Sequence, residues 1–243
     1  HVTFAYPDGE EAVLKDISFS VKKGETIAFI GSTGSGKSTL ISLVPRFYDV
    51  SQGSIRINGR DIRSYKIDSL RACIGYVAQK AVLFRGSIEE NIRFGNAHAS
   101  QQEIEKAAHV AQAYDFIMEK PEQFQERIVE GATNVSGGQK QRLSIARALV
   151  RHPQICIYDD SFSALDFATD AKLRKALKPE IKDSIMMIVA QRVSTIMNAD
   201  HILVLDEGKT VGYGTHTALL KNCPVYKEIA LSQLSEEELT YGK

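Results

Sequence analysis

The chain has 243 residues, 43% of them hydrophobic, and it carries as many acidic as basic side chains. That length and apolar content suit one large globular domain or two coupled subdomains, and a net charge of zero gives no electrostatic reason to expect nucleic acid as a partner. Three scattered cysteines without C-x-x-C spacing, and no run of eighteen apolar residues, argue against a disulfide framework, a zinc site and a membrane-spanning segment in this chain.

Residues 1–30 alternate short apolar runs with turns, a pattern that predicts a small antiparallel sheet. The expected strands cover residues 2–6, 12–14 and 17–21, and the turns cover 7–9 and 22–24. Tyr6 precedes the first turn and could stack its ring on an adenine base, although a single aromatic residue in a strand more often packs in the core or at a sheet edge.

The strongest motif is G-x-x-x-x-G-K-S at residues 31–38. Such a loop wraps phosphate groups with its backbone N–H groups, and here it follows an expected buried strand at 25–30 and precedes a helix that opens near Thr39. In this reading Lys37 reaches the β- and γ-phosphates and the Ser38 hydroxyl binds Mg²⁺. A Gly/Ser-rich linker is the alternative, but the flanking strand and helix argue against it.

The next stretch contains a hairpin and then a helical region. Residues 53–59 form a strand that ends in the turn pair Asn58-Gly59, and residues 74–78 form a strand that ends at Gln79. From about residue 82 to residue 152 apolar residues recur at three- and four-residue spacing, with helices expected at 87–94, 100–108 and 111–118. This pattern predicts a helical insertion into an α/β core.

The insertion ends in Ser136-Gly137-Gly138-Gln139, where a serine occupies an N-cap position before a helix with an apolar stripe. Each glycine costs about 1 kcal/mol in a helix interior, which suggests a functional reason for the pair. Exposed N–H groups beside a serine hydroxyl could form a second anion site. The alternative is a capped surface helix.

Residues 155–158 form a buried strand that ends in two adjacent carboxylates, Asp159 and Asp160. Sheets of α/β proteins place their ligands at this end of the strands, so the pair could organise Mg²⁺, or it could simply end the strand in a turn. A helix at 167–177, a strand at 185–190 followed by Gln191, two strands at 201–205 and 209–213, and a helical end with an acidic tail complete the chain.

Read in this order, the motifs resemble the nucleotide-binding domain of the ATP-binding-cassette (ABC) family over essentially the whole chain. The sequence SGGQ, about a hundred residues after the phosphate loop and shortly before a strand that ends in Asp, is particular to that family, and residues 45–49 and 82–92 resemble its exporter branch. The resemblance implies an α/β P-loop NTPase core with an antiparallel β subdomain and an inserted α-helical subdomain. Residues 1–81 and 153–243 would form the core and β subdomain, and residues 82–152 the helical subdomain.

The resemblance also implies roles for individual residues, with ATP and Mg²⁺ as cofactors. Tyr6 matches the adenine-stacking aromatic, Gln79 the Q-loop residue that touches Mg²⁺ and senses the membrane domain, and Asp159 the Walker B acid. Glu130 matches an acidic residue that contacts the coupling helices, and Asp166 matches the D-loop aspartate. The implied nucleotide-binding residues are Gly31, Ser32, Thr33, Gly34, Ser35, Gly36, Lys37, Ser38 and Thr39 in this chain, with Ser136, Gly137, Gly138 and Gln139 serving the ATP of a partner domain.

Two positions depart from the family pattern. Asp160 stands where the family usually has a catalytic glutamate, and Gln191 stands where it usually has a switch histidine. Aspartate is one methylene shorter than glutamate, and an amide cannot carry a proton as imidazole does. Loss of a positioned general base typically costs about 10²–10⁴-fold in rate.

The two departures together resemble the degenerate half of a heterodimeric exporter, with a different and catalytically complete second half, transmembrane domains as partners, and a location at the cytoplasmic face of the cell membrane. Three other readings stay open. The departures could be neutral variants, the chain could be a soluble ABC ATPase outside transport, or it could be a nucleotide-gated dimerisation module without turnover.

Overall fold

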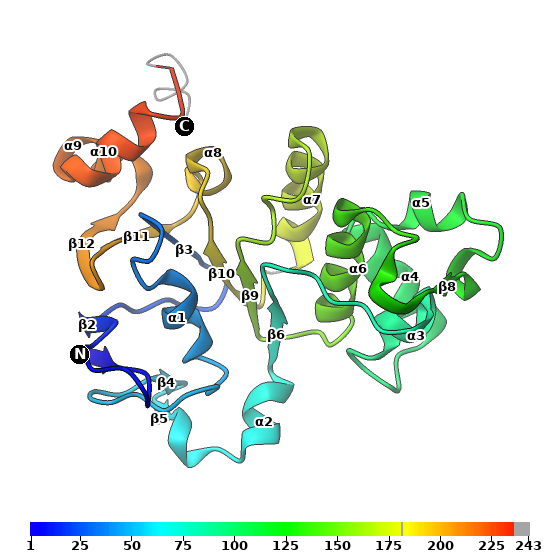
Figure 1. The fold of residues 1–243 in the computed structure, drawn as a ribbon, viewed down its shortest axis with the longest axis horizontal. Helices are drawn as coiled ribbons and strands as arrows, with labels where there is room; N and C mark the ends of the chain where they lie inside the picture. Colours follow the sequence, from blue (N-terminus) through cyan, green and yellow to red (C-terminus); the bar gives the residue numbers. More distant parts are fainter. Residues whose placement is uncertain (181, 236–243) are drawn as a thin grey trace.

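The computed structural model describes residues 1–180 and 182–235, and its centre is a twisted sheet (Figure 1). Within the described residues six strands form this sheet in the order β12-β11-β3-β10-β9-β6. Neighbouring strands are parallel except at β12, which pairs with β11 in the antiparallel direction. The strands are β3 (Thr26–Gly31), β6 (Ile74–Val77), β9 (Ile155–Asp159), β10 (Ile185–Val189), β11 (His201–Asp206) and β12 (Lys209–Gly214).

The five parallel strands are buried on both faces, as expected for near-continuous apolar strands, whereas the edge strand β12 is partly exposed. Alternate side chains point to opposite faces, so that in β9 Ile157 joins one apolar cluster and Tyr158 joins the other. The cluster with Ile157 includes α1 (Lys37–Ser42) and α2 (Ile67–Ala72). The cluster with Tyr158 includes the helices of the opposite face, among them α6 (Gly137–Leu149) and α7 (Phe167–Glu180).

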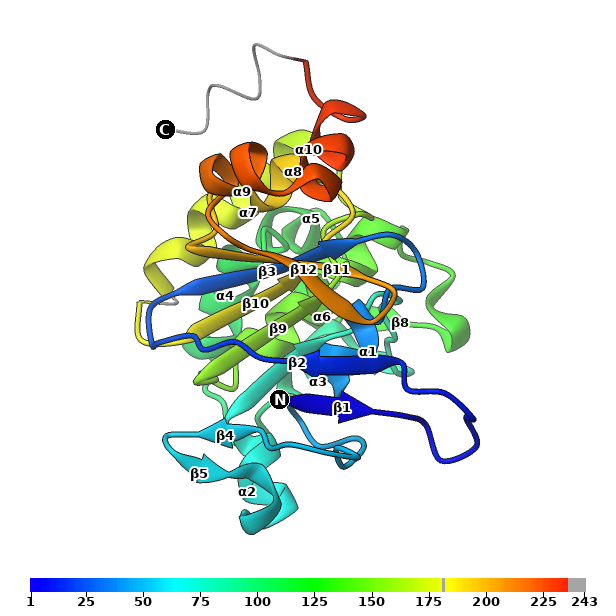
Figure 2. The same ribbon diagram turned by 90° about the vertical axis from the view of Figure 1, so that its left-hand side faces the viewer.

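The remaining helices of that second face come from the C-terminal part of the chain. They are α8 (Val193–Ile196), α9 (His216–Asn222) and α10 (Pro224–Leu231), and they lie together at one end of the molecule (Figure 2). None of the described helices is both long enough and apolar enough to cross a membrane. The acidic tail expected after residue 235 lies outside the described residues.

Short antiparallel pairs lie beside α1. The strands β1 (Val2–Phe4) and β2 (Leu14–Ile17) form one pair, and β4 (Arg56–Ile57) and β5 (Arg60–Asp61) form the other. The turn of the second pair is the predicted Asn58-Gly59, and both residues have positive φ, 51° and 76°, as a type I′ turn requires.

The N-terminal strands differ from the prediction, because a single strand, β2, stands where two were expected at 12–14 and 17–21, and β1 is shorter than the expected 2–6. The structure ends β1 at Phe4, so Tyr6 lies beyond the strand, and it assigns no strand to residues 18–21. The β1–β2 ladder is irregular because its register shifts between Val2 and Phe4, and Asp16, within β2, has a positive φ of 55°. These irregularities interrupt the ladder between β1 and β2, so fewer residues pair than the alternating apolar pattern predicted.

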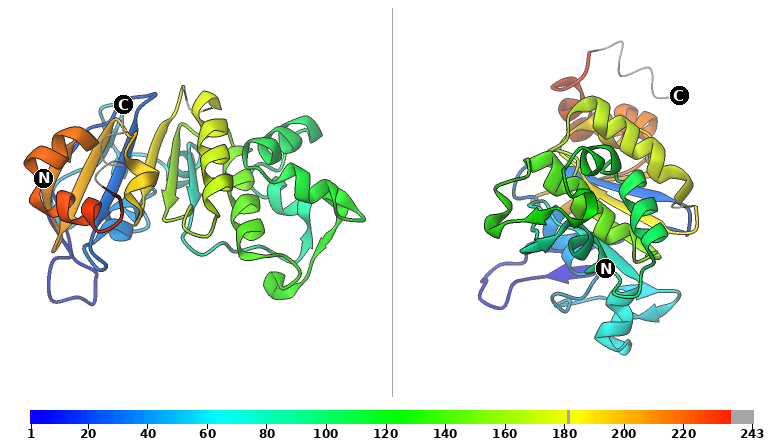
Figure 3. Two further views of the ribbon diagram at one scale, coloured as in Figure 1. Left: turned by 90° about the horizontal axis from the view of Figure 1, so that it is seen from above. Right: turned by 90° about the vertical axis from the view of Figure 1, so that its right-hand side faces the viewer.

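Helices α3 (Ile88–Arg93), α4 (Gln101–Val110), α5 (Tyr114–Met118) and α6 lie beyond strand β6 and form the group drawn in green (Figure 3). The helix start predicted at residue 111 was wrong, because Gln112 has a positive φ of 57° and separates α4 from α5. Short elements complete the region and its surroundings: β7 (Gly86–Ser87), β8 (Arg127–Ile128), η1 (Ile62–Ser64), η2 (Gln123–Gln125) and η3 (Glu130–Ala132).

Candidate active site

The loop between β3 and α1 folds around the Lys37 ammonium group. Lys37 Nζ donates hydrogen bonds to the carbonyl oxygens of Gly31 at 2.8 Å and Ser32 at 2.7 Å. Burial lowers the pKa of Lys37, and the nearby charges of Asp160 and Asp159 oppose that shift. The loop therefore holds a positive charge at the carboxyl end of the sheet, facing two acids.

The first turn of α1 offers backbone N–H groups to the same space. Its N-cap is Gly36, with φ of 97°, and no side chain among the described residues caps the helix. A β-carbon at Gly36 would lie 2.7 Å from Leu14 Cδ2, so the tight loop requires glycine here. Uncapped N–H groups beside a lysine form a suitable cradle for phosphate.

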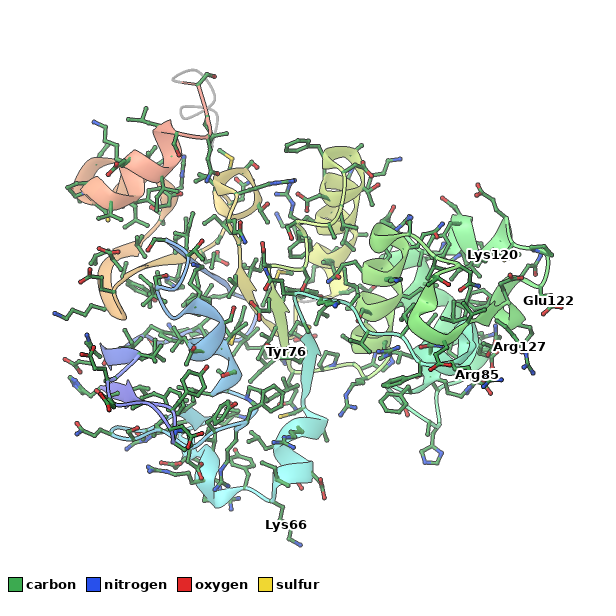
Figure 4. The ribbon with its side chains drawn as sticks, in the orientation of Figure 1. Lys66, Tyr76, Arg85, Lys120, Glu122 and Arg127 are labelled. Atoms are coloured by element: carbon green, nitrogen blue, oxygen red, sulfur yellow. The ribbon has the colours of Figure 1, made fainter. Side chains whose placement is uncertain are left out.

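Asp159 ends β9 beside α1. Its Oδ1 accepts a hydrogen bond from Ser38 Oγ at 2.8 Å, and its Oδ2 accepts one from the Tyr76 hydroxyl at 3.3 Å. Burial raises the pKa of the Asp159 carboxyl, while these two hydrogen bonds oppose the rise. Figure 4 shows Tyr76 in β6 near the centre of the molecule.

Asp160 lies at the junction of three segments that are distant in the sequence. Its Oδ2 accepts hydrogen bonds from Gln191 Nε2 at 2.7 Å and from Gln79 Nε2 at 3.2 Å. Burial raises the pKa of the Asp160 carboxyl, and the hydrogen bonds from Gln79 and Gln191 act in the opposite direction. Asp160 also has a positive φ of 46°, which is unusual for a residue other than glycine.

The oxygen donors around Asp159 suit Mg²⁺. No group of three or more His, Cys, Asp or Glu side chains in residues 1–180 and 182–235 could hold a metal ion. Mg²⁺ is usually held by one or two carboxylates together with water and substrate phosphate oxygens, so the Asp159 carboxylate and the Ser38 hydroxyl, joined at 2.8 Å, fit this ion.

The predicted signature lies on the opposite face of the sheet from α1 (Figure 1). Ser136 caps α6 in a reciprocal capping box: its Oγ accepts from Gln139 N at 3.2 Å, and Gln139 Oε1 accepts from Ser136 N at 3.0 Å. Ser136 and Gly137 are exposed. The structure thus brings Gln79, Asp159, Asp160 and Gln191 together with the phosphate loop, and it places the signature residues on another surface.

Tyr6 reaches the end of the phosphate loop. Its hydroxyl lies 2.9 Å from Thr39 Oγ1, and its ring contacts Phe4 and Tyr48 edge to face. Adenine stacking therefore stays a prediction for a residue that also packs within an aromatic cluster.

Asp166 and Glu130 lie outside the site of this chain. Asp166 accepts hydrogen bonds from the backbone N and the hydroxyl of Thr169 at the start of α7, and Glu130 is exposed at the start of η3. Their predicted contacts with other domains stay predictions.

Sequence reasoning missed three residues that act on this site. Tyr76 binds Asp159, and the buried Gln141 of α6 donates to Ala78 O at 3.3 Å, next to Gln79. Gln233 donates to Gln191 O at 2.8 Å. Only the adjacency of β6 and β9 in the sheet could have suggested Tyr76, and no local signal marks the two glutamines.

The parallel sheet, the lysine-bearing loop and the acid at the end of β9 define a P-loop NTPase. Residues 14–163 match the family model described as ABC transporter, and the chain therefore belongs to the ABC transporter family.

Relatives and a solved structure agree with this assignment. An uncharacterized ABC transporter ATP-binding protein of Mycobacterium tuberculosis is 45% identical over 95% of this chain and 40% of its own length. A putative multidrug export ATP-binding/permease protein of Staphylococcus aureus is 45% identical over 94% of this chain and 40% of its own length. A bacterial Atm1-family ABC exporter with ATP bound matches with a TM-score of 0.93 and 38% identity over 97% of this chain and 41% of its own. The chain thus spans about two fifths of the length of these proteins.

Proposed function

We propose that this chain is the ATP-binding motor domain of an exporter. One similar protein is named as a putative multidrug export ATP-binding/permease protein, and another is an Atm1-family ABC exporter. Each of them is about two and a half times as long as the region that matches this chain. Transmembrane domains would accompany this chain in the complete transporter, at the cytoplasmic face of the cell membrane. We also propose that residues 82–152 form the helical subdomain, since the helices of this region lie together beyond β6 (Figure 3).

ATP binds in this proposal along the loop from Gly31 to Thr39. Lys37 exchanges the carbonyls of Gly31 and Ser32 for phosphate oxygens, and the uncapped N–H groups at the start of α1 complete the cradle. Ser38, Asp159 and Gln79 would hold Mg²⁺, which supplies charge neutralisation of the phosphates when it is bound. Tyr6 would lie against the adenine ring.

The second half of the ATP site comes from another domain. The signature, residues 136–139, lies at the start of α6, whose core side chains pack on the face of the sheet opposite α1. In this proposal it therefore does not contact the nucleotide bound at the phosphate loop of the same chain. We propose that its residues serve the nucleotide of a second, non-identical nucleotide-binding domain that carries a complete set of catalytic residues.

The contacts of Asp160 carry the proposal that this site hydrolyses ATP slowly. A general base needs a free lone pair within hydrogen-bond distance of the attacking water. In this chain Asp160 Oδ2 accepts amide hydrogen bonds from Gln79 and Gln191, which orient the carboxylate and leave Oδ1 free of these two amides. The oriented carboxylate is one methylene shorter than the glutamate that the family usually has, so its reach toward the attacking water is shorter, and Gln191 cannot accept a proton at neutral pH.

The test restores the residues that the family usually has. Asp160→Glu combined with Gln191→His is expected to raise turnover at this site by at least about tenfold, with ATP affinity unchanged. The measurement is the ATPase rate of the assembled protein with the catalytic glutamate of the other domain disabled. Because both groups act on one transition state, Asp160→Glu alone should give only part of the gain.

A matched control is Asp115→Glu, the same chemical change at an exposed position of α5. It should leave the rate unchanged. If the double variant stayed at the background rate, Asp160 and Gln191 would not limit hydrolysis. The chain would then act as a nucleotide-gated dimerisation module. The hydrogen bonds of Asp160 to Gln79 and Gln191 are compatible with that role as well.

A further inference from the structure

The loop after β10 is held at its backbone by a side chain from the far end of the described chain. Gln233 Nε2 donates a hydrogen bond to Gln191 O at 2.8 Å, and Gln233 Oε1 accepts one from Val193 N at 2.8 Å. The side-chain amide of Gln233 therefore binds the backbone of the residue before Arg192 and that of the residue after it. It uses one donor and one acceptor of the loop backbone.

The position of Gln233 is fixed by the packing of α10. Tyr226 and Ala230 are fully buried, and the Tyr226 hydroxyl lies 2.7 Å from His216 Nδ1 in α9. The backbone N–H groups of Gln233 and Leu234 both bind Ala230 O, which closes the helix end. Gln233 follows α10 and reaches Val193, the first residue of α8.

The same loop is anchored on its other side by α7. Arg174 binds the carboxylate of Asp170 with two hydrogen bonds of 3.0 and 3.1 Å, and its Nη1 donates to Ser194 O at 3.2 Å. Asp170 is buried. Arg174 thus holds the loop at Ser194 and the buried Val193 side chain holds it in the core, while Gln233 alone among the described residues donates a side-chain hydrogen bond to Gln191 O.

We propose that Gln233 is a positioning residue for the candidate active site. By fixing the backbone of Gln191, it aims the Gln191 side chain at Asp160 Oδ2, 2.7 Å away. The proposal rests on the proposed function, in which Gln191 and Asp160 face the γ-phosphate and the attacking water. Gln233 touches neither the phosphate loop nor Asp159 in the hydrogen bonds of the described residues, so it should act on the hydrolytic step and leave nucleotide binding alone.

The first test is hydrogen–deuterium exchange of the Val193 amide in the full-length protein without nucleotide. Gln233→Ala should speed this exchange by at least about threefold, while the amides of β10 stay protected. Gln101→Ala is the matched control, because the Gln101 amide binds Glu105 within α4 at 3.0 Å. An unchanged Val193 rate would overturn the proposed hold on the loop, whether or not the protein hydrolyses ATP.

The second test is steady-state ATP turnover of the same assembled protein with the catalytic glutamate of the other domain disabled, so that only this site is counted. Gln233→Ala should lower kcat by about three- to tenfold and change KM for ATP by less than about twofold. In a Gln191→Ala background the Gln233→Ala change should cause no further loss, because its effect passes through Gln191. Additive losses, or a rise in KM without a fall in kcat, would overturn the positioning role.

The variant Gln233→Glu separates the two hydrogen bonds. A carboxylate still accepts from Val193 N–H but cannot donate to Gln191 O. Val193 should stay protected while kcat falls between the values of wild type and Gln233→Ala. A wild-type protein without any turnover would contradict the proposed function, and the exchange result would still decide whether Gln233 holds the loop.

Discussion

The two glycine-containing helix starts of this protein, at α1 and at α6, differ in how their N–H groups are satisfied. Helix α1 follows its N-cap Gly36, has no capping side chain among the described residues, and starts at the half-buried Lys37. Helix α6 begins at Ser136, whose side chain and that of Gln139 form a complete capping box on an exposed surface.

The start of α1 therefore leaves backbone N–H groups that an external anion could bind, whereas α6 is capped by side chains of its own. Free N–H groups at α1 can be satisfied by phosphate, and the positive charge of Lys37 stands next to them. At α6 the N–H groups of Ser136 and Gln139 already have side-chain partners, and Ser136 and Gly137 are exposed. The comparison supports the proposal that the start of α1 binds nucleotide within this chain and that the start of α6 contacts a nucleotide held by another domain.

The largest expected effect is that of Lys37→Ala on ATP affinity. Removing a charged hydrogen-bond donor from phosphate costs about 1.5–3 kcal/mol, so affinity should fall about 10- to 100-fold. Isothermal titration calorimetry of the domain measures this change. The matched variant in α6 is Lys140→Ala, whose ammonium binds Gly131 O, and it should bind ATP as tightly as wild type. Equal affinities for both variants would refute the assignment of the phosphate loop.

The next effect concerns the backbone of the loop. Gly36→Ala forces a β-carbon into a left-handed conformation and against Leu14, which should lower the free energy of unfolding by about 1–2 kcal/mol or more. Urea denaturation in the absence of nucleotide gives this value. A variant as stable as wild type would mean that the loop adopts a different conformation in solution.

A smaller effect is expected for Ser136→Ala. Loss of the N-cap should cost about 1 kcal/mol of stability, because Gln139 N loses the Ser136 Oγ that accepts its hydrogen bond. ATP affinity of the isolated domain should not change, while turnover of the assembled protein should fall. A collapse of affinity in the isolated domain would show that the signature serves its own chain and not a partner.

The smallest effect is expected for Gly137→Ala in the first turn of α6. A β-carbon there meets no atom within 4 Å, and alanine restricts the unfolded chain, so stability should rise by up to about 0.5–1 kcal/mol. Thermal unfolding measures this gain. A loss of stability would contradict the open surface that the structure gives to this helix start, and a loss of turnover in the assembled protein would indicate that a partner approaches closely here.

Local sequence patterns were sufficient for the elements whose causes are local. The phosphate loop needs its glycines and Lys37 in one short segment, the Asn58-Gly59 turn needs positive φ at two adjacent residues, and Ser136 caps the helix that starts directly after it. The buried strand that ends at Asp159 follows from a run of apolar residues. In each case the interaction that stabilises the element joins residues a few positions apart, so the sequence alone determines it.

The tertiary structure decided which distant groups meet. Asp160 binds Gln79, 81 residues away, and Gln233 binds Gln191, 42 residues away. The sheet order places β6 beside β9, which brings Tyr76 to Asp159, and the positive φ of Gln112 delays to Tyr114 a helix that apolar spacing had started at residue 111. Hydrogen bonds of this kind depend on the packing of whole elements against one another. The residue type and its neighbours in the sequence do not show which distant group this packing will bring within hydrogen-bond distance.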